Sequence, residues 1–461
     1  MYLSLDLLNA FLFTFLRSRL SAMIAFGLIA TVITACAPDE DSSSDSELDT
    51  LASWGISADS SGSTVYYTGF AYGDVEANSG SSVADIFTTS YSSSGNRNWI
   101  EQTGTALEDF PQAITVAASG NVYVAGYTEG ELESGAWQGA ADCFVIKYNA
   151  SGTEQWVKQY GSVDNDYCWG IAADSSENLY VIGGTKSVFP DSGATNTKGD
   201  DLVLFKLNAS GVRQWVKQLG RDGAISENTY SNTYGVAVDV DASNNVIIGG
   251  VTNDSIGGTA LGDYDILLAA YDTSGNQTWI EQLGTAYGDY LRGLKVAASG
   301  NIYLTGYTYG TADPDYDYAD YDEDADSTEV FLYKYSAAGS QQWVRQNGTS
   351  GEDRGYGLAI DSSENIFVTG ATSGDMEGSN AGSYDIFILK YSSSGSLSWE
   401  VQNGSDVYDM ATGVTTDSSN NVIVVGKTYG TFDSLSNSET AFTSFATQYD
   451  GSGNRQWTDL F

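Results

Sequence analysis

The chain has 461 residues, of which 41% are hydrophobic and 13% are aromatic, with 52 Gly and only 4 Pro. This composition is typical of a globular protein with many tight turns and a large core. The 19 Lys and Arg residues face 60 Asp and Glu residues, and the net charge of −41 excludes nucleic acids and anionic membrane surfaces as partners.

The sequence contains no His. This excludes Ser-His-Asp and Cys-His catalysis, and it excludes every metal site that depends on imidazole. Catalysis by carboxylates alone is not excluded.

Residues 1–35 have the pattern of an export signal. Arg17 and Arg19 precede an apolar run, too short for a membrane span, that ends in small residues directly before Cys36. The sequence Ile-Thr-Ala-Cys at 33–36 resembles the bacterial lipobox, in which the Cys is acylated and becomes the new N-terminus. The resemblance implies that Cys36 carries a lipid anchor. An ordinary signal peptide that happens to contain a Cys is the alternative.

Residues 36–53 begin with an acidic, Ser-rich stretch that lacks the apolar content needed to fold. We interpret this segment as a tether that holds the body of the protein off the membrane. Ala37 does not look like an inner-membrane retention signal. The resemblance to lipoproteins therefore favours the bacterial outer membrane or the cell surface, with membrane contact through the anchor alone.

From residue 54 onward, one motif recurs seven times with constant internal spacing. It consists of an aromatic residue or Leu, a Gly four residues later, and a Trp four residues after the Gly. The intervals between successive Trp residues run from 56 to 64 residues, just above the range typical of propellers and solenoids. The seven are Trp99, Trp156, Trp215, Trp279, Trp343, Trp399 and Trp457.

The second unit shows the strand pattern within one repeat. Short apolar or alternating segments at 113–117, 121–128, 143–148 and 155–160 each have the length of a strand. Turn sequences rich in Gly, Ser and Asn separate them, and no segment between them has helical periodicity. Each unit is therefore predicted to form four antiparallel strands.

Four-stranded units repeated radially are propeller blades, and closing the ring protects the sheet edges. We predict an all-β fold, a seven-bladed β-propeller of four-stranded antiparallel blades. In this register no N-terminal strand completes the last blade, so closure rests on packing between blades unless residues 48–53 add a pairing. The units are predicted at 54–104, 112–161, 169–220, 234–284, 292–348, 356–404 and 412–461.

Segments such as GIAADSSENLYVIGGT followed by DLVLFKLNASGVRQWVKQLG resemble the bacterial beta-propeller repeat family SBBP, found mostly in exported bacterial proteins. The resemblance covers about residues 54–461. The Trp turn also resembles, more weakly, quinoprotein-type propellers, which include an outer-membrane lipoprotein that assists barrel assembly. The seventh unit departs most from the pattern, because its third strand lacks the initial acid and the dense apolar run.

The repeated Trp residues have two interpretations, an aromatic binding surface or wedges between adjacent blades. One residue per blade at identical spacing is what packing between blades requires, so we favour the second. A Gln follows three residues after each of the first six Trp residues, and we interpret it as a hydrogen-bonding residue of the edge strand.

Two series of acids also recur, and both are expected on the same face. Their functional interpretation is a ring of cation ligands, but repetition favours the capping of turns by Asp side chains. One series stands at the start of the third strand, at Asp85, Asp142, Asp201, Asp265, Glu329 and Asp385. The other precedes the first strand, at Asp109, Asp166, Asp289, Asp353 and Asp409.

Cys143 and Cys168 are the two Cys residues of the predicted mature body. Export permits a disulfide between them. Cys143 starts a predicted strand, and Cys168 is expected just ahead of the first strand of the next unit, on the same face of the neighbouring blade. A buried, unpaired Cys143 is the alternative, because other units carry Ile or Leu at its position.

Two segments interrupt the repeats. The insert of the fifth unit carries Asp320, Asp322, Asp324 and Asp326, whose alternate spacing is that of Ca²⁺ loops, although Ala325 stands where an EF-hand has Gly. A solvated acidic loop is the alternative, and Ca²⁺ is the one cofactor candidate. The connector at 221–233 is the second interruption, and we expect it to cover one end of the central channel.

We expect a monomeric, non-catalytic binding or scaffold module of the cell envelope, with an unidentified protein or glycan partner bound by loops on one face. A periplasm-facing assembly factor is the first alternative. A carboxylate-dependent, glycan-active enzyme is the second, because paired carboxylates and 31 Tyr residues suit sugar chemistry.

Overall fold

The computed structural model describes most of the compact unit Glu47–Phe461. The described residues are 51–73, 75, 83–194, 199–220, 231–316, 327–378, 380–432, 435 and 442–460. The predicted signal peptide, Cys36, the candidate Ca²⁺ ligands Asp320, Asp322, Asp324 and Asp326, and positions 221–230 of the connector lie outside them.

The described residues form 28 β-strands and no helix. The first two sheets contain β1 (Leu51–Ala58), β2 (Thr64–Tyr72), β3 (Ala84–Ser92), β4 (Arg97–Thr103), β5 (Asp109–Val116), β6 (Val122–Thr128), β7 (Asp142–Tyr148) and β8 (Glu154–Tyr160). Next come β9 (Asp166–Ala173), β10 (Leu179–Thr185), β11 (Gly199–Leu207), β12 (Arg213–Leu219), β13 (Ser231–Val240), β14 (Val246–Thr252), β15 (Asp265–Tyr271) and β16 (Gln277–Leu283).

The remaining three sheets follow in the same order along the chain. They contain β17 (Asp289–Val296), β18 (Ile302–Thr308), β19 (Glu329–Tyr335), β20 (Gln341–Asn347), β21 (Asp353–Ile360), β22 (Ile366–Thr372), β23 (Asp385–Tyr391), β24 (Leu397–Asn403), β25 (Asp409–Thr416), β26 (Val422–Thr428), β27 (Thr443–Tyr449) and β28 (Arg455–Leu460).

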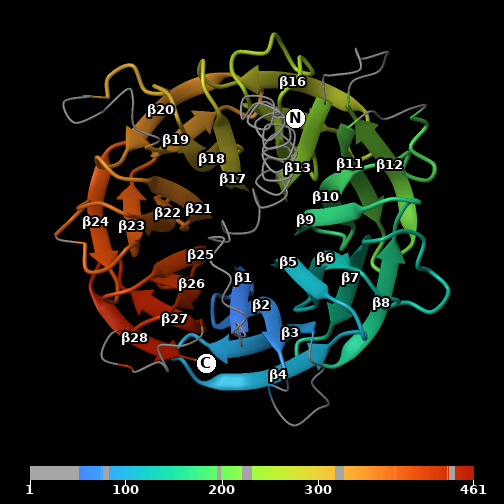
Figure 1. Ribbon diagram of the computed structural model, residues 1–461, viewed down its shortest axis with the longest axis horizontal. Helices are drawn as coiled ribbons and strands as arrows, with labels where there is room; N and C mark the ends of the chain where they lie inside the picture. Colours follow the sequence, from blue (N-terminus) through green and yellow to red (C-terminus); the bar gives the residue numbers. More distant parts are fainter. Residues whose placement is uncertain are drawn as a thin grey trace, which may run out of the picture. The chain divides into compact units, whose positions relative to one another are not determined.

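Five sheets have four antiparallel strands each, and one sheet has eight. The eight-stranded sheet joins β9–β12 to β13–β16 through a short parallel pairing of β11 with β13, at Gly199 with Ser231 and Asp200 with Asn232. The sheets follow one another around a ring, with the first strand of each group innermost (Figure 1). The expectation of an all-β fold built from four-stranded antiparallel sheets is confirmed.

The first strands are longer than the sequence pattern predicts. In the second unit we expected a strand at 113–117, but β5 runs from Asp109 to Val116, and Asp109 pairs with Thr128 of β6. A register shift between Pro111 and Ala113 interrupts the alternation of side chains. The interruption hides the first half of the strand from a search for period-2 hydrophobicity.

The ring closes without exchange of a strand. β1 contacts the innermost strands on both sides, β5 and β25. At the closing junction Tyr67 and Phe87 of the first sheet share an apolar cluster with Val425 and Ala446 of the last. Closure therefore rests on side-chain packing, as at every other junction.

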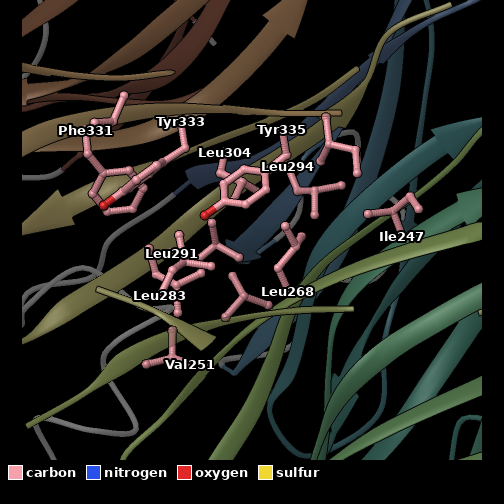
Figure 2. Close-up of a cluster of buried hydrophobic side chains, with 14 of the residues drawn as sticks. Ile247, Val251, Leu268, Leu283, Leu291, Leu294, Leu304, Phe331, Tyr333 and Tyr335 are labelled. Atoms are coloured by element: carbon pink, nitrogen blue, oxygen red, sulfur yellow. The ribbon is translucent and has the colours of Figure 1, made fainter. Parts of the chain in front are cut away.

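Apolar side chains fill the space between neighbouring sheets. Figure 2 shows the largest such cluster, in which Leu268 from β15 meets Leu291 and Leu294 from β17. Phe331 and Tyr333 from β19 complete it, and both are almost fully buried. Sheet-on-sheet burial of this kind supplies the main stabilisation of the fold.

The repeated Trp and Gly residues meet at the junctions between sheets. The indole nitrogen of Trp99 donates a hydrogen bond of 3.1 Å to the carbonyl of Ala150, which lies in the β7–β8 hairpin of the next sheet. A Cβ added to Gly152 of that hairpin would lie 2.7 Å from the Trp99 ring. Gly275, Gly339, Gly395 and Gly453 face the Trp of the preceding sheet in the same way, with an added Cβ at 2.9 to 3.2 Å from the ring. At the closing junction Gly95 lies on Trp457 more loosely, with an added Cβ at 3.5 Å. The Trp is thus a wedge that fits only a hairpin without a side chain at this position.

The Trp–Gly contact can be tested with two matched substitutions. Gly339 has φ +79°, and a Cβ added to it would lie 2.9 Å from the ring of Trp279. Gly193 has φ +76°, and a Cβ added to it would meet no atom within 4 Å. Gly193→Ala should cost only the backbone strain of a left-handed residue, about 1 kcal/mol. Gly339→Ala should cost about 2 kcal/mol more, because the methyl group displaces the indole. Equal shifts of the urea midpoint for both variants would contradict the wedge.

Candidate functional site

The two ends of the ring differ in construction. At one end, which we call the hairpin end, lie the connections between first and second strands and between third and fourth strands. At the other end, which we call the loop end, lie the connections between second and third strands and those that lead to the next sheet. The order of the strands in each sheet requires this division.

The hairpin end consists of short turns that repeat one hydrogen-bond pattern. In the β7–β8 hairpin, Oδ1 of Asn149 accepts the backbone N–H groups of Ser151 at 3.0 Å and Thr153 at 2.9 Å. Asp272 does the same for Ser274 and Asn276. These are side-chain-capped turns that stabilise the hairpins, and their uniformity leaves little room for individual recognition.

At the loop end, the repeated Gln residues are bonded to the third-strand acids. Nε2 of Gln159 donates to Oδ2 of Asp142 at 3.0 Å and to the carbonyl of Gly130 at 2.9 Å, and its Oε1 accepts the N–H of Leu132 at 3.0 Å. One amide thus ties the outermost strand, β8, to the start of the β6–β7 loop of the same sheet. The pattern recurs for Gln102 with Asp85, Gln218 with Asp201, Gln282 with Asp265 and Gln402 with Asp385.

The first-strand acids are buried beside these bonds. Oδ2 of Asp289 accepts the N–H of Thr285 at 2.6 Å, and Asp109 accepts the N–H of Thr105 at the same distance. Burial raises the pKa of Asp289 to about 6, against the hydrogen bonds from Thr308 and Thr285 that lower it. Burial likewise raises the pKa values of Asp109, Asp166 and Asp353 to about 6.

Glu329 is the most perturbed carboxyl group. Burial and the nearby charge of Asp353 raise its pKa to about 8, although a hydrogen bond of 2.9 Å from the Tyr316 hydroxyl opposes the shift. Its position is the third-strand position that Asp occupies in five other units. The longer side chain brings a second carboxyl group close to Asp353, whose charge disfavours ionisation of Glu329.

These contacts favour turn capping over a ring of cation sites. The acids accept hydrogen bonds from backbone N–H and Gln groups through Oδ2, as a capping side chain does. The second oxygen, Oδ1, is buried without a hydrogen-bond partner in Asp142, Asp166, Asp289, Asp353, Asp385 and Asp409. Among the residues that the structure describes, no group of three or more acidic or Cys side chains is arranged to hold a metal ion.

The buried acids predict stability that rises as the pH falls. Because the pKa of Asp289 is about 6 in the folded chain against an ordinary 3.8, its contribution to stability is complete below 3.8 and is lost as the pH rises through 6. Between pH 7.5 and pH 5 each such group should add about 1.4 kcal/mol.

Thermal unfolding at the two pH values measures this gain, and Asp289→Asn should lose part of it. Asp263→Asn, which removes the same charge from an exposed position, should retain it. A wild-type melting temperature that is lower at pH 5 than at pH 7.5 would contradict the prediction.

The loop end also carries most of the exposed apolar surface. Among the described residues ten large hydrophobic side chains are exposed, and eight of them lie in its connections, against Val212 and Leu397 near the hairpin end. Trp137 is 51% exposed and Tyr287 55%. The other six are Leu107, Val163, Val188, Leu261, Val407 and Leu435.

A strip of aromatic side chains crosses the inner part of the same end. Phe70 of the first sheet meets Phe110 of β5 at 5.1 Å between ring centroids, and Phe110 meets Tyr127 of β6 at 5.3 Å. Tyr127 then contacts Tyr167 and Trp169 of β9, which stack on each other at 5.5 Å. Phe70 is buried, whereas Phe110, Tyr127, Tyr167 and Trp169 are partly exposed, and such aromatic faces in a row suit planar or sugar ligands.

The repeat pattern in the sequence does not single out this strip. Phe110 and Tyr167 directly follow the first-strand acids, and Trp169 is a Trp outside the repeated motif. These three residues were the available signal. The register shift in each first strand obscured which side chains are exposed.

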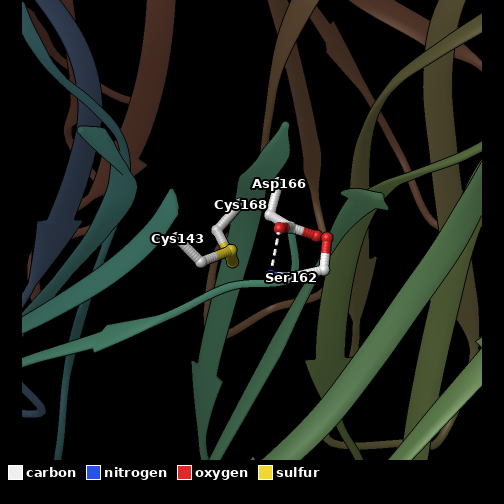
Figure 3. The surroundings of a disulfide bond; sticks show 4 residues. All are labelled: Cys143, Ser162, Asp166 and Cys168. Atoms are coloured by element: carbon white, nitrogen blue, oxygen red, sulfur yellow. Dashed lines mark hydrogen bonds between the residues drawn. A yellow bond between two sulfur atoms is a disulfide. The ribbon is translucent and has the colours of Figure 1, made fainter. Parts of the chain in front are cut away.

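The structure joins Cys143 of β7 to Cys168 of β9 in a disulfide, with Cα atoms 5.3 Å apart (Figure 3). Both side chains are fully buried, so the bond links two neighbouring sheets inside their interface. Cys168 lies within β9 rather than just ahead of it. Close by, Oδ2 of Asp166 accepts the N–H of Ser162, so this junction combines the disulfide with the repeated acid contact.

The family model described as SBBP, beta-propeller repeat, matches residues 155–190 and 342–375. The chain contains SBBP repeats. In the structure these two segments cover an outermost strand and the first two strands of the next sheet. SBBP repeats together with four-stranded sheets around a ring make this protein a β-propeller.

Curated relatives share only part of the propeller. A 139-residue segment is 26% identical to the regulatory protein FlaEY of Caulobacter vibrioides, and covers 29% of this chain and 15% of that protein. A 169-residue segment is 25% identical to an uncharacterized WD repeat-containing protein, L264, of Acanthamoeba polyphaga mimivirus, and covers 30% of this chain and 12% of the relative. The chain therefore spans a small fraction of these relatives.

Solved structures with related architecture are distant. The Pan2 WD40 domain of Neurospora crassa is 9% identical, with a TM-score of 0.43, over 81% of this chain and 85% of that domain. The acylaminoacyl peptidase of Pyrococcus horikoshii is 10% identical, with a TM-score of 0.46, over 89% of this chain and 53% of the peptidase. Similarity at this level says nothing about what the propeller binds.

Proposed function

We propose that this protein is an exported, lipid-anchored, seven-bladed β-propeller that acts as a non-catalytic binding or scaffold module at the bacterial cell envelope. The blade count treats the eight-stranded sheet as two blades. Its two halves each have the four-strand order of the other sheets, and the pairing that joins them spans only two residues on each strand.

The contrast between the two ends of the ring carries the proposal. The hairpin end repeats one capped turn, whereas the loop end carries eight of the ten exposed large hydrophobic side chains and the aromatic strip of Phe70, Phe110, Tyr127, Tyr167 and Trp169. Exposed apolar groups that cluster on one face are typical of interaction sites. Recognition on repeat scaffolds also resides in variable loops held by a regular frame.

The perturbed carboxyl groups support a non-catalytic role. A raised pKa is a common sign of a catalytic acid, but here four Asp residues with a pKa of about 6 repeat from sheet to sheet and are at most 1% exposed. A substrate cannot reach groups at that depth. Their repetition is explained by the turns that they cap.

Envelope location rests on the lipobox-like sequence that ends at Cys36 and on the acidic segment that follows it. Among the described residues no helix is long and apolar enough to span a membrane. Attachment by acyl chains on Cys36 is the mode of membrane association that we propose.

Fractionation and protease shaving of the source organism test the location. The wild-type chain should sediment with membranes, and Cys36→Ser should release it, because the acyl chains are lost. Removal of the propeller from intact cells by protease would place it on the outer surface, and protection until the envelope is opened would place it in the periplasm. A Cys36→Ser chain that still sediments with membranes would contradict the anchor.

A pair of double variants tests the binding face. Trp137→Ser with Tyr287→Ser removes exposed apolar groups from the loop end, and Val212→Ser with Leu397→Ser removes them from the hairpin end. All four side chains are at least 42% exposed, so stability should change by about 0.5 kcal/mol or less per site. Binding of the full chain to isolated envelope fragments should weaken about tenfold in the first variant only. Equal loss in both would refute the assignment of the face.

A further inference from the structure

Two arginines from adjacent first strands share one aromatic ring at the loop end. The guanidinium carbon of Arg292, on β17, lies 5.3 Å from the ring centroid of Tyr307, and that of Arg354, on β21, lies 5.4 Å from it. Arg292 also lies 5.9 Å from the ring of Tyr356 and donates a hydrogen bond of 3.1 Å to the Tyr307 hydroxyl. Both guanidinium groups are therefore oriented by tyrosines.

The charge of this cluster differs from that of the chain as a whole. Arg354 pairs with Glu352 at 3.2 Å, and the Tyr384 hydroxyl donates to the same carboxylate. Burial raises the pKa of Tyr356, and the charges of both Arg354 and Arg292 act to lower it. Two arginines against Glu352 give this group a net positive charge in a protein whose net charge is −41.

Aromatic faces border the two arginines. Tyr290 stacks on Tyr307 with ring centroids 5.1 Å apart and planes at 21°, and Tyr290 also contacts Tyr264 of the preceding sheet at 5.5 Å. Tyr290, Arg292 and Tyr356 are partly exposed. Guanidinium groups bind carboxylates through two parallel hydrogen bonds, and tyrosine rings cover the C–H faces of sugars while their hydroxyl groups bond to sugar hydroxyls.

We propose that Arg292 and Arg354, with Tyr290, Tyr307 and Tyr356, form a binding subsite for the carboxylate of an acidic saccharide. This inference rests on the proposed binding function of the loop end and names its ligand class. The arginines bind the carboxylate, and the partly exposed Tyr290 and Tyr356 contact the sugar ring that bears it. Tyr307 is buried and orients both arginines.

The charge of the protein selects among acidic ligands. A densely charged polyanion brings many negative groups within a Debye length, about 8 Å at physiological salt, of a surface that is acidic overall. A saccharide with one carboxylate every second residue brings far fewer such groups. Widely spaced uronates are therefore preferred over heparin-like chains and over poly-acidic peptides.

Two probes that differ only in the carboxylate test the proposal. The first is an oligosaccharide of alternating glucuronate and glucose residues, and the second is the same oligosaccharide with its carboxyl groups reduced to alcohols. Titration calorimetry with the full chain should show binding of the first about tenfold tighter than of the second, because a charge-assisted contact is lost. A sialic acid-terminated oligosaccharide distinguishes a uronate site from a general carboxylate site.

Variants assign the contact to the two arginines. Arg292→Gln and Arg354→Gln should each weaken binding of the acidic probe about tenfold and leave binding of the reduced probe unchanged. Arg354→Lys, which keeps the charge but loses the planar fork, should recover only part of the affinity. The control is Arg213→Gln, which removes an arginine that also lies over an aromatic ring, Phe189 at 5.6 Å, and also pairs with a carboxylate, Asp191 at 2.6 Å.

The outcomes separate this inference from the proposed function. Equal binding of both probes, preference for a poly-acidic peptide, or failure of any acidic saccharide to bind would overturn the carboxylate subsite. If Trp137→Ser with Tyr287→Ser still weakened binding to envelope fragments, the proposed function would stand without the carboxylate subsite. If Arg213→Gln weakened binding as much as Arg292→Gln, the effect would be one of overall charge and the subsite would be refuted. Unchanged thermal unfolding of each variant excludes misfolding as the cause.

Discussion

The contact between a Trp and a hairpin Gly in the next sheet is the constraint on which the rest of this structure depends. The hairpin position has a left-handed backbone that favours Gly, and at Gly152, Gly275 and Gly339 a Cβ would also crowd the indole ring. The Trp must in turn stand at a set distance along the chain. Each sheet is thereby docked on its neighbour at the hairpin end. The closing junction uses the same contact, through Gly95 and Trp457, so the ring needs no shared strand.

At the loop end, buried polar contacts hold the frame. In five sheets a Gln–Asp bond links the outermost strand to the start of the third strand. The first-strand acids cap the turns that lead to the next sheet. Burying carboxyl groups is costly unless hydrogen bonds compensate, and the raised pKa values of Asp289 and Glu329 record the remaining cost. The disulfide between Cys143 and Cys168 adds a covalent link at one junction.

The Trp–Gly contacts, the Gln–Asp bonds and the capping acids account for the repeated residues. We therefore assign recognition to residues that do not repeat. Trp169, Arg292 and Arg354 occupy first strands at positions where other sheets carry different side chains. Their neighbours on adjacent sheets complete the aromatic strip and the arginine cluster. The frame thus holds dissimilar side chains of successive units next to one another at one end of the ring.

The sequence by itself determined the strands, the turns and the repeat, since these follow from local periodicity and from the spacing of Tyr, Gly and Trp. Tertiary structure alone decided which residues of different units meet. Arg292 and Arg354 are a full repeat apart in the chain, and Tyr127 and Trp169 lie in successive units. No local pattern reports such contacts. They arise because radial packing sets each first strand beside the next, and because a register shift decides which of its side chains remain exposed.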